Sequence, residues 1–576
     1  MYYQVQILVV LYPRYVLYKV CRHCKHDCSL VSLSTIVQIL FFQIDFFVNG
    51  TMSIDTDINV HIQKQFEEFQ LDGDDFRHGS GVSAAKRIAA NIQKHVQILA
   101  LNNGFDDSGE VFSTFLTPLL TKYIDVALTT EIDPETNDSI ERVLNLVAAV
   151  AVSCVVSSNG DYSLQDTLDR IGIFSKCPAE KVRSQACMLL ASFTCHLKIV
   201  KDCLEWKSTF LVAIEALLLQ RLTDKSQLVR LRAIQATGIF LASTMQLGTP
   251  GLLEPLVWSS VHDPSVANRV EAIRAIPVDS IDTLNHIITR IRDVKEKVRV
   301  GAIEKLRETT LSVYDHIMTE EQFCEIVKFG LTERCEITKN ATIELICCKF
   351  MKVAKFCPVG LMRLMGATTH EDQAEMALRA VFETVYSTAE DKSRILRGLS
   401  DPEFRSFEEN INKSMIKIEK DSSFDEYQIF YTRIACETAK KSSNLTFSQK
   451  EDLMARATPD IPMLCDLFQK HLSRLEELEE GAQETEEQES IEKIVEQEIF
   501  VCLELLRLVK VSDLQEEGSR RFFTNTMTNV LTRVSTPDEL VEECVEALRV
   551  TYEDECHFFD AISMITVDIN SGMFFR

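Results

Sequence analysis

Residues 224–230 read Asp-Lys-Ser-Gln-Leu-Val-Arg, and this phrase decides the fold because it returns through the middle of the chain. An acidic residue begins the phrase, a valine follows five positions later, and an arginine follows six positions later. The copies begin about 30 to 47 residues apart, which is the period of a HEAT or armadillo array of helix pairs. The other copies, two close and two weaker, span residues 263–269, 293–299, 177–183 and 333–339.

Each phrase is expected to begin a helix. An acidic side chain caps a helix start, Pro264 suits a first turn, and the later valine faces a neighbouring helix. One helix pair cannot bury its apolar face alone, so the pairs must stack. The sequence therefore predicts an all-α fold, a HEAT-repeat α-solenoid in which antiparallel helix pairs stack into a superhelix.

The composition agrees with a long helical array. Only 19 glycines and 13 prolines interrupt 576 residues, and 46% of the residues are hydrophobic. Few helix breakers and an ample apolar fraction favour continuous helix packing. The 18 cysteines follow no disulfide spacing and lie in apolar runs such as residues 346–348. Buried thiols of this kind are typical of a reducing compartment.

The first 51 residues differ from the rest of the chain. Residues 1–51 are rich in Tyr, Phe, Val and Cys, and we interpret them as a doubtful extension outside the fold, with Met52 as the true start. The apolar run 33–48 is too short and too interrupted to predict a membrane span or a signal sequence. Crowded cysteines and histidines at 21–28 lack a second ligand pair, so no metal site is expected.

The remaining chain divides into three parts. Residues 52–473 are expected to form the N-terminal and central HEAT-repeat solenoid. Residues 474–492 are rich in glutamate and are interpreted as an acidic linker or insertion. Residues 493–576 resume a helical periodicity and are expected to add further HEAT-like helices, in a truncated array.

No catalytic constellation is visible in the sequence. It contains no phosphate-binding glycine loop, no nucleophile elbow and no paired-histidine zinc motif. His262 and His370 lie beside acidic residues, but both fall at expected repeat turns. We therefore expect a protein that is not an enzyme and that has no catalytic residue, cofactor or metal.

Charge is distributed unevenly along the chain, whose formal net charge is −25. Residues 176–310 hold 19 Lys and Arg against 14 Asp and Glu, a balance of +5, whereas residues 451–560 hold 10 against 28, a balance of −18. Basic side chains that turn toward one groove would form a track for a phosphate backbone. The candidate DNA-contacting residues are Lys86, Arg87, Lys181, Arg183, Lys225, Arg230, Arg232, Arg290, Arg292, Lys295, Lys297 and Arg299.

A structural role competes with this interpretation. In stacked helix pairs, the arginine of each phrase can pair with the acid of the next repeat, and we favour this inter-repeat ladder for Arg230, Arg269 and Arg299. The other basic candidates stand outside the ladder position. For those, an ordinary solvated helix face and a DNA contact remain open alternatives.

Residues 221–350 closely resemble the HEAT-repeat G subunit of condensin, the CAP-G family. The resemblance is carried by residues 221–233 and 263–269, and above all by residues 288–299, which read Ile-Thr-Arg-Ile-Arg-Asp-Val-Lys-Glu-Lys-Val-Arg. It continues at residues 330–334. Weaker resemblance extends to about residues 60 and 550, and residues 1–51 match nothing in the pattern.

The resemblance implies a non-catalytic subunit that supports mitotic chromosome condensation. Such a subunit binds double-stranded DNA in a basic groove together with a kleisin, and meets the SMC ATPase subunits indirectly. The implied location is the nucleus and condensed chromosomes, with the cytoplasm outside mitosis, and no membrane partner. The alternative is a HEAT-repeat scaffold of the transport-receptor or adaptor type that binds only proteins.

Overall fold

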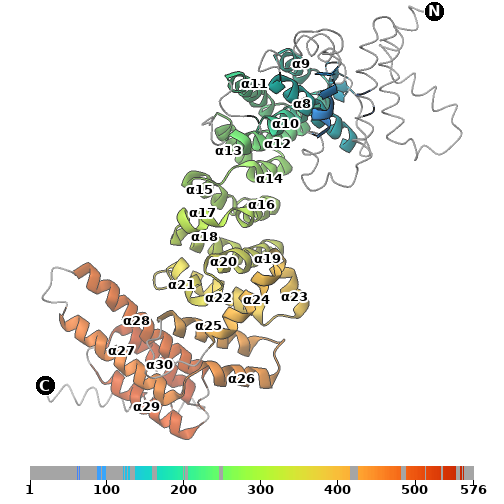
Figure 1. The fold of residues 1–576 in the computed structure, drawn as a ribbon. Helices are drawn as coiled ribbons and strands as arrows, with labels where there is room; N and C mark the ends of the chain where they lie inside the picture. The colour runs from blue at the N-terminus through green and yellow to red at the C-terminus, as the bar shows by residue number, and fades with distance from the viewer. Residues whose placement is uncertain are drawn as a thin grey trace, which may run out of the picture. The chain divides into compact units, whose positions relative to one another are not determined.

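The computed structural model describes residues 137–157, 165–198, 205–244, 251–415, 426–481, 488–512, 516–533 and 536–552, together with short pieces and single residues between 61 and 129 and near 200, 514 and 560. Every regular element in these described stretches is a helix, so the all-α prediction is confirmed there. The chain divides into two compact units, of which unit 1 ends at Pro277 and unit 2 begins at Val278; Figure 1 shows the helices of each. The residues expected to lie outside the fold, 1–51, are outside the described part.

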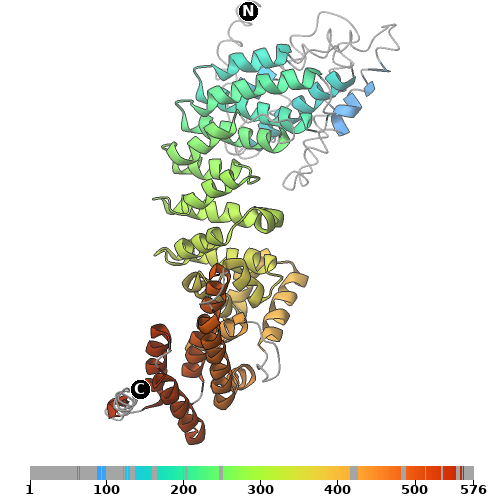
Figure 2. The ribbon, with the colours of Figure 1, turned by 90° about the vertical axis from the view of Figure 1, so that its left-hand side faces the viewer.

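Unit 1 is built from two layers of helices. The first helices of its pairs, α9, α11 and α13, pack side by side in one layer, and the second helices, α10, α12 and α14, continue from α8 in the other. Figure 2 shows helices of this unit in stacked rows. The bounds are α8 (Asn137–Ser157), α9 (Gln165–Ser175), α10 (Glu180–Leu197), α11 (Glu205–Leu222), α12 (Gln227–Thr244), α13 (Leu253–His262) and α14 (Val266–Ala275).

Unit 2 begins with the same arrangement and continues into longer helices. The pairs α15/α16 and α18/α19 repeat the pattern of unit 1, and then α22, α25, α28 and α30 pack in succession. A single π-helical turn, η5, joins α19 to α20. The bounds are α15 (Ile281–Arg290), α16 (Glu296–Glu308), α17 (Leu311–His316), α18 (Glu320–Leu331), α19 (Glu336–Leu345), η5 (Ile346–Phe350), α20 (Met351–Val353), α21 (Pro358–Met365), α22 (Glu371–Val385), α23 (Ala389–Ile395), η6 (Leu396–Gly398), α24 (Asp401–Ser414), α25 (Glu426–Lys441), α26 (Phe447–Ala457), α27 (Ile461–Gly481), α28 (Gln488–Val511), α29 (Glu517–Leu531) and α30 (Asp538–Thr551).

The acid of each phrase shapes the turn within a helix pair. Asp224 Oδ1 accepts a hydrogen bond from the Ser226 amide at 2.9 Å, and Asp263 Oδ1 accepts one from the Ser265 amide at 2.8 Å. Helices α12 and α14 begin three residues after these acids, so the acid closes an Asx turn. The prediction that the acid itself caps the helix was wrong, because the chain first needs two residues to reverse direction. In α14 the cap is Ser265, whose side chain accepts from the Asn268 amide.

The valine that follows the acid by five positions lies in the core in two phrases, as the pattern predicts. Val229 and Val298 are fully buried, and so is Cys347 in the apolar run after α19. Burial raises the pKa of the Cys187 thiol to about 12, so this cysteine packs as a small hydrophobic residue. Across the described stretches, no helix is both long and apolar enough to span a bilayer.

Candidate nucleic-acid interface

Two phrase arginines of unit 1, Arg183 and Arg230, form an arginine ladder, here defined as the ion pairs from a phrase arginine to the acid that begins the next phrase. Arg183 donates through two nitrogens to the two carboxylate oxygens of Asp224, both at 2.9 Å. Arg230 binds Asp263 in the same bidentate way, at 2.7 and 3.1 Å. Each arginine also holds its own turn: Nη1 of Arg183, Arg230 and Arg269 donates to the carbonyl that begins its phrase, at 2.9 Å in each repeat.

Unit 2 repeats this geometry once more. Arg299 donates to the Asp293 carbonyl at 2.9 Å and forms an ion pair with Glu333, also at 2.9 Å. The ladder is therefore confirmed for Arg230 and Arg299, and Arg183 belongs to it as well. Burial alone would raise the pKa of Asp224 and Asp263, but hydrogen bonds from arginine and from the turn amides leave both pKa values below the ordinary range.

Four basic candidates stand exposed at the same turns, and we call them the turn-edge lysines. Lys225 directly follows Asp224, and Lys181 is the second residue of α10. In unit 2, Lys295 immediately precedes α16 and Lys297 is its second residue. All four side chains are exposed, so the ladder arginines lie within each turn while the lysines project from it.

The remaining candidates are engaged in local contacts or lie elsewhere. Arg232 donates to Gln235 at 3.1 Å, and Arg290 lies 3.8 Å from Asp293. Arg292 pairs with Glu325 and stacks over the Phe329 ring, with 3.6 Å between the guanidinium carbon and the ring centroid. Of the two earliest candidates, Arg87 is exposed on a helix and Lys86 lies outside the described residues.

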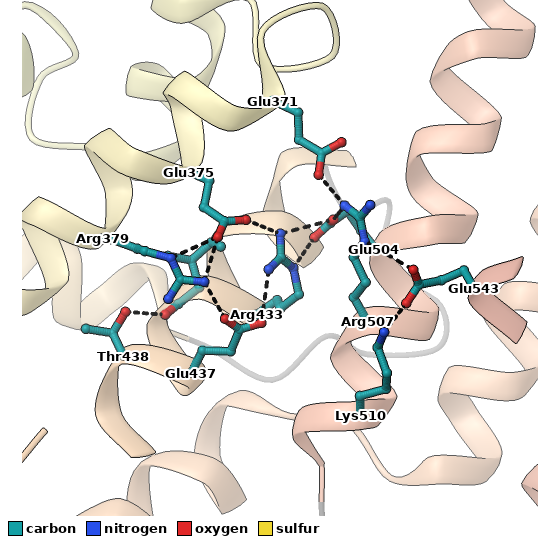
Figure 3. A network of polar contacts seen from close by, with 11 residues as sticks. Glu371, Glu375, Arg379, Arg433, Glu437, Thr438, Glu504, Arg507, Lys510 and Glu543 are labelled. Carbon is teal, nitrogen blue, oxygen red and sulfur yellow. Dashed lines mark hydrogen bonds and ion pairs between the residues drawn. The ribbon is translucent and has the colours of Figure 1, made fainter. Parts of the chain in front are cut away.

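Sequence reasoning missed a second set of ion pairs, the distal charge network, which crosses α22, α25, α28 and α30 (Figure 3). At its centre, Arg433 donates to Glu504 at 2.6 Å, to Glu437 at 3.0 Å and to Glu375 at 2.9 Å. Glu504 is fully buried, and burial raises its pKa despite Arg433 and Arg507 beside it. The other members are Glu371, Arg379, Lys510 and Glu543.

A signal for this network was present in the sequence. Glu504 and Arg507 stand inside the otherwise apolar run 501–509, where a lone charge requires a partner. The partners could not be deduced because Arg433 lies 71 residues before Glu504 and no phrase repeats between them.

The described residues offer no group of histidine, cysteine and acidic side chains arranged to hold a metal ion. Of the two histidines beside acids, His262 ends α13 at a phrase turn and His370 directly precedes α22. Both therefore occupy the repeat-turn positions expected from the sequence.

Comparison with known proteins gives a relative and a fold. No protein-family model matches the chain. The chain is 22% identical over 341 residues to condensin complex subunit 3 of Xenopus laevis, covering 59% of this chain and 30% of that protein. It is also similar in structure to a chain of the S. pombe condensin Cnd3–Cnd2 subcomplex, with a TM-score of 0.61, 18% identity, and coverage of 89% of this chain and 56% of that chain.

These findings bear on two of the predictions. The curated relative supports the resemblance to a condensin HEAT-repeat subunit, and the solved structure confirms the all-α solenoid fold. The chain spans about a third of the curated relative's length and just over half of the solved chain's. The narrower assignment to the G subunit stays a prediction.

Proposed function

We propose that this chain acts as a non-catalytic, G-type subunit of a condensin complex, which binds double-stranded DNA together with a kleisin and supports mitotic chromosome condensation. The chain is similar to a curated condensin subunit, and the solved structure that it resembles is a complex named for two condensin subunits. The proposal places the chain in the nucleus on condensed chromosomes, in indirect contact with the SMC ATPases.

The DNA-binding part of the proposal is supported by the position of the turn-edge lysines. Lys181, Lys295 and Lys297 stand at the amino-terminal ends of helices, where the helix dipole is already positive. A cation at this end is unfavourable for helix stability, so these positions favour a role in binding. The exposed ammonium groups stand beside Glu180 and Glu296 in the same first turns, and they would contact a phosphate that approaches these helix ends.

The ladder arginines are less suited to DNA contact. Arg183 is buried and Arg230 is half-buried, and each guanidinium is already bound by a carboxylate and a turn carbonyl. We therefore propose that they fix the turns that present the lysines. The division of the chain at 474–492 is likewise proposed; α27 ends at Gly481 and α28 begins at Gln488, both inside this glutamate-rich stretch.

The test is duplex DNA binding by the purified chain, with and without a fragment of the kleisin from the same organism, over a series of salt concentrations. We expect the kleisin to increase affinity, and the affinity to fall steeply with salt because phosphate contacts release counterions. No binding to a long duplex with the kleisin present, or binding that salt leaves unchanged, would instead favour the scaffold that binds only proteins.

A further inference from the structure

Residues 333–339, the last copy of the phrase, lie beside the copy before them in unit 2. Arg299 donates through Nη1 to the Asp293 and Val294 carbonyls, at 2.9 and 3.3 Å. Its Nε also forms an ion pair with Glu333 at 2.9 Å. One guanidinium therefore touches both turns, and the helices that follow them, α16 and α19, pack against each other. We call these two neighbouring turns the paired turns.

Arg334 is an exposed cation of the second of the paired turns. It occupies the second position of its phrase, which is the position of Lys225 in the phrase of unit 1. Its backbone amide donates to Glu333 Oε1 at 2.8 Å. Within the part of the chain that the structure describes, its guanidinium has no ion pair or hydrogen bond. Arg334 therefore differs from the ladder arginines, whose guanidinium groups are bound inside the protein.

Most acidic side chains of the paired turns already have a basic partner. The pairs are Asp293 with Arg290 at 3.8 Å, Glu333 with Arg299 at 2.9 Å and Glu336 with Lys339 at 3.6 Å. The remaining acid of the two phrases is Glu296, exposed between Lys295 and Lys297. Lys295, Lys297 and Arg334 are all exposed, and the described chain gives none of these three side chains an ion pair. The exposed charge of the paired turns is therefore positive.

We propose that Arg334 is a further DNA-contacting residue, and that it acts with Lys295 and Lys297 as one contact to the phosphates of a single strand. This inference rests on the proposed function. Packed helices lie about 8 to 10 Å apart, and one strand of a duplex carries a phosphate about every 3.4 Å along its axis. The paired turns therefore span about three phosphates. A guanidinium can donate two parallel N–H groups to one phosphate, which adds geometric specificity that a lysine lacks.

The flanking acids explain why the sequence did not single out Arg334. Glu333 and Glu336 make the segment look neutral when charges are counted along the chain. In the structure, Arg299 of the preceding phrase holds Glu333, and Lys339 holds Glu336. The charge of Arg334 therefore becomes available only because the two phrases are stacked.

The test is duplex DNA binding with the kleisin fragment present, measured by fluorescence anisotropy over a series of salt concentrations. Arg334→Ala should weaken binding about fivefold at about 0.15 M salt and make the log–log slope shallower by about 1, because one phosphate contact is lost. Arg334→Lys keeps the charge and should keep the slope of wild type. Adding Arg334→Ala to Lys295→Ala and Lys297→Ala should raise the total change in slope from about 2 to about 3.

Two controls separate the charge of Arg334 from local structure. Ile337→Ser changes an uncharged side chain of the same turn that is 61% exposed. Arg405→Ala removes an exposed arginine from α24 in the same unit. Both variants should bind like wild type, and circular dichroism checks that every variant keeps its fold. An equal loss in either control would overturn the proposal, since the effect would not belong to the Arg334 contact.

The lysine variant distinguishes failure of this inference from failure of the proposed function. If Lys295→Ala with Lys297→Ala weakens binding while Arg334→Ala leaves affinity and slope unchanged, Arg334 is not a DNA contact and the inference is wrong, although the DNA-binding function stands. If the wild-type chain with the kleisin fragment does not bind a long duplex, the proposed function fails and this inference fails with it.

Discussion

Each phrase arginine serves two repeats at once. Arg183 holds the carbonyl that begins its own turn and the carboxylate that begins the next, with both its side chain and that of Asp224 only 5% exposed. A buried ion pair adds little net stability over apolar packing, but removal of one partner leaves an uncompensated buried charge. The arginine therefore fixes the register between neighbouring repeats.

Arg183→Ala should lower the free energy of unfolding of unit 1 by about 1.5 to 3 kcal/mol, because the buried Asp224 loses its bidentate partner and keeps only Arg221 and the Ser226 amide. Urea unfolding followed by circular dichroism measures the change. Lys181→Ala, at an exposed position two residues away, is the matched control and should shift stability by less than about 0.5 kcal/mol. A loss below about 1 kcal/mol for Arg183→Ala would show that the pair is dispensable.

The ladder also makes the folding stability depend on pH in the acidic range. In the folded protein, the pKa values of Asp224 and Asp263 lie below the ordinary range. The two carboxylates therefore contribute to folding stability above the unfolded-state pKa of about 3.9, and this contribution is lost as the pH falls through the folded-state pKa values. Melting temperature should therefore fall more steeply below about pH 4 in wild type than in a protein with Asp224→Asn and Asp263→Asn. Parallel curves for the two proteins would contradict the assignment.

At the scale of helices, short-range and long-range features differ in how far the sequence predicts them. The phrase predicted the paired helices, the buried Val229 and the partners of Arg230 and Arg299, because the same acid, valine and arginine positions recur within each copy. It did not predict the distal charge network, whose partners come from helices with no shared phrase.

The distal charge network should connect α22, α25 and α28 cooperatively. Arg433→Met should lower the free energy of unfolding by about 3 to 5 kcal/mol, since Glu504 is fully buried and would lose its central partner. Adding Glu504→Leu should recover much of that loss, because an apolar pair of similar size needs no counter-charge. Thermal unfolding measures both, and hydrogen exchange reports on the amides of α25 and α28. A double variant no more stable than Arg433→Met would show that Glu504 is not the charge left unpaired.

At the scale of the whole molecule, some charged side chains form ion pairs inside the protein, and others are exposed and can bind a partner. Some of the excess acidic side chains of residues 451–560 form ion pairs within the protein, since Glu504 and Glu543 belong to the distal charge network. In the phrase repeats, the ladder arginines form ion pairs within the protein and the turn-edge lysines are exposed. Among the twelve basic candidates, we therefore propose the four turn-edge lysines, two in each unit, as the main DNA contacts. Sequence alone separated the ladder arginines from the others, but it could not show which of the others are exposed.

The most direct test of this account is the salt dependence of duplex DNA affinity in wild type and in the variant with Lys181, Lys225, Lys295 and Lys297 all changed to alanine. An exposed set of equal charge, Lys328→Ala with Lys413→Ala, Lys441→Ala and Lys470→Ala, is the control. The account predicts that the turn-edge variant binds more weakly and that its log–log slope is shallower by about 3 to 4, with unfolding unchanged and the control set like wild type. A turn-edge variant with the affinity and slope of wild type, or a control set that loses as much, would contradict it.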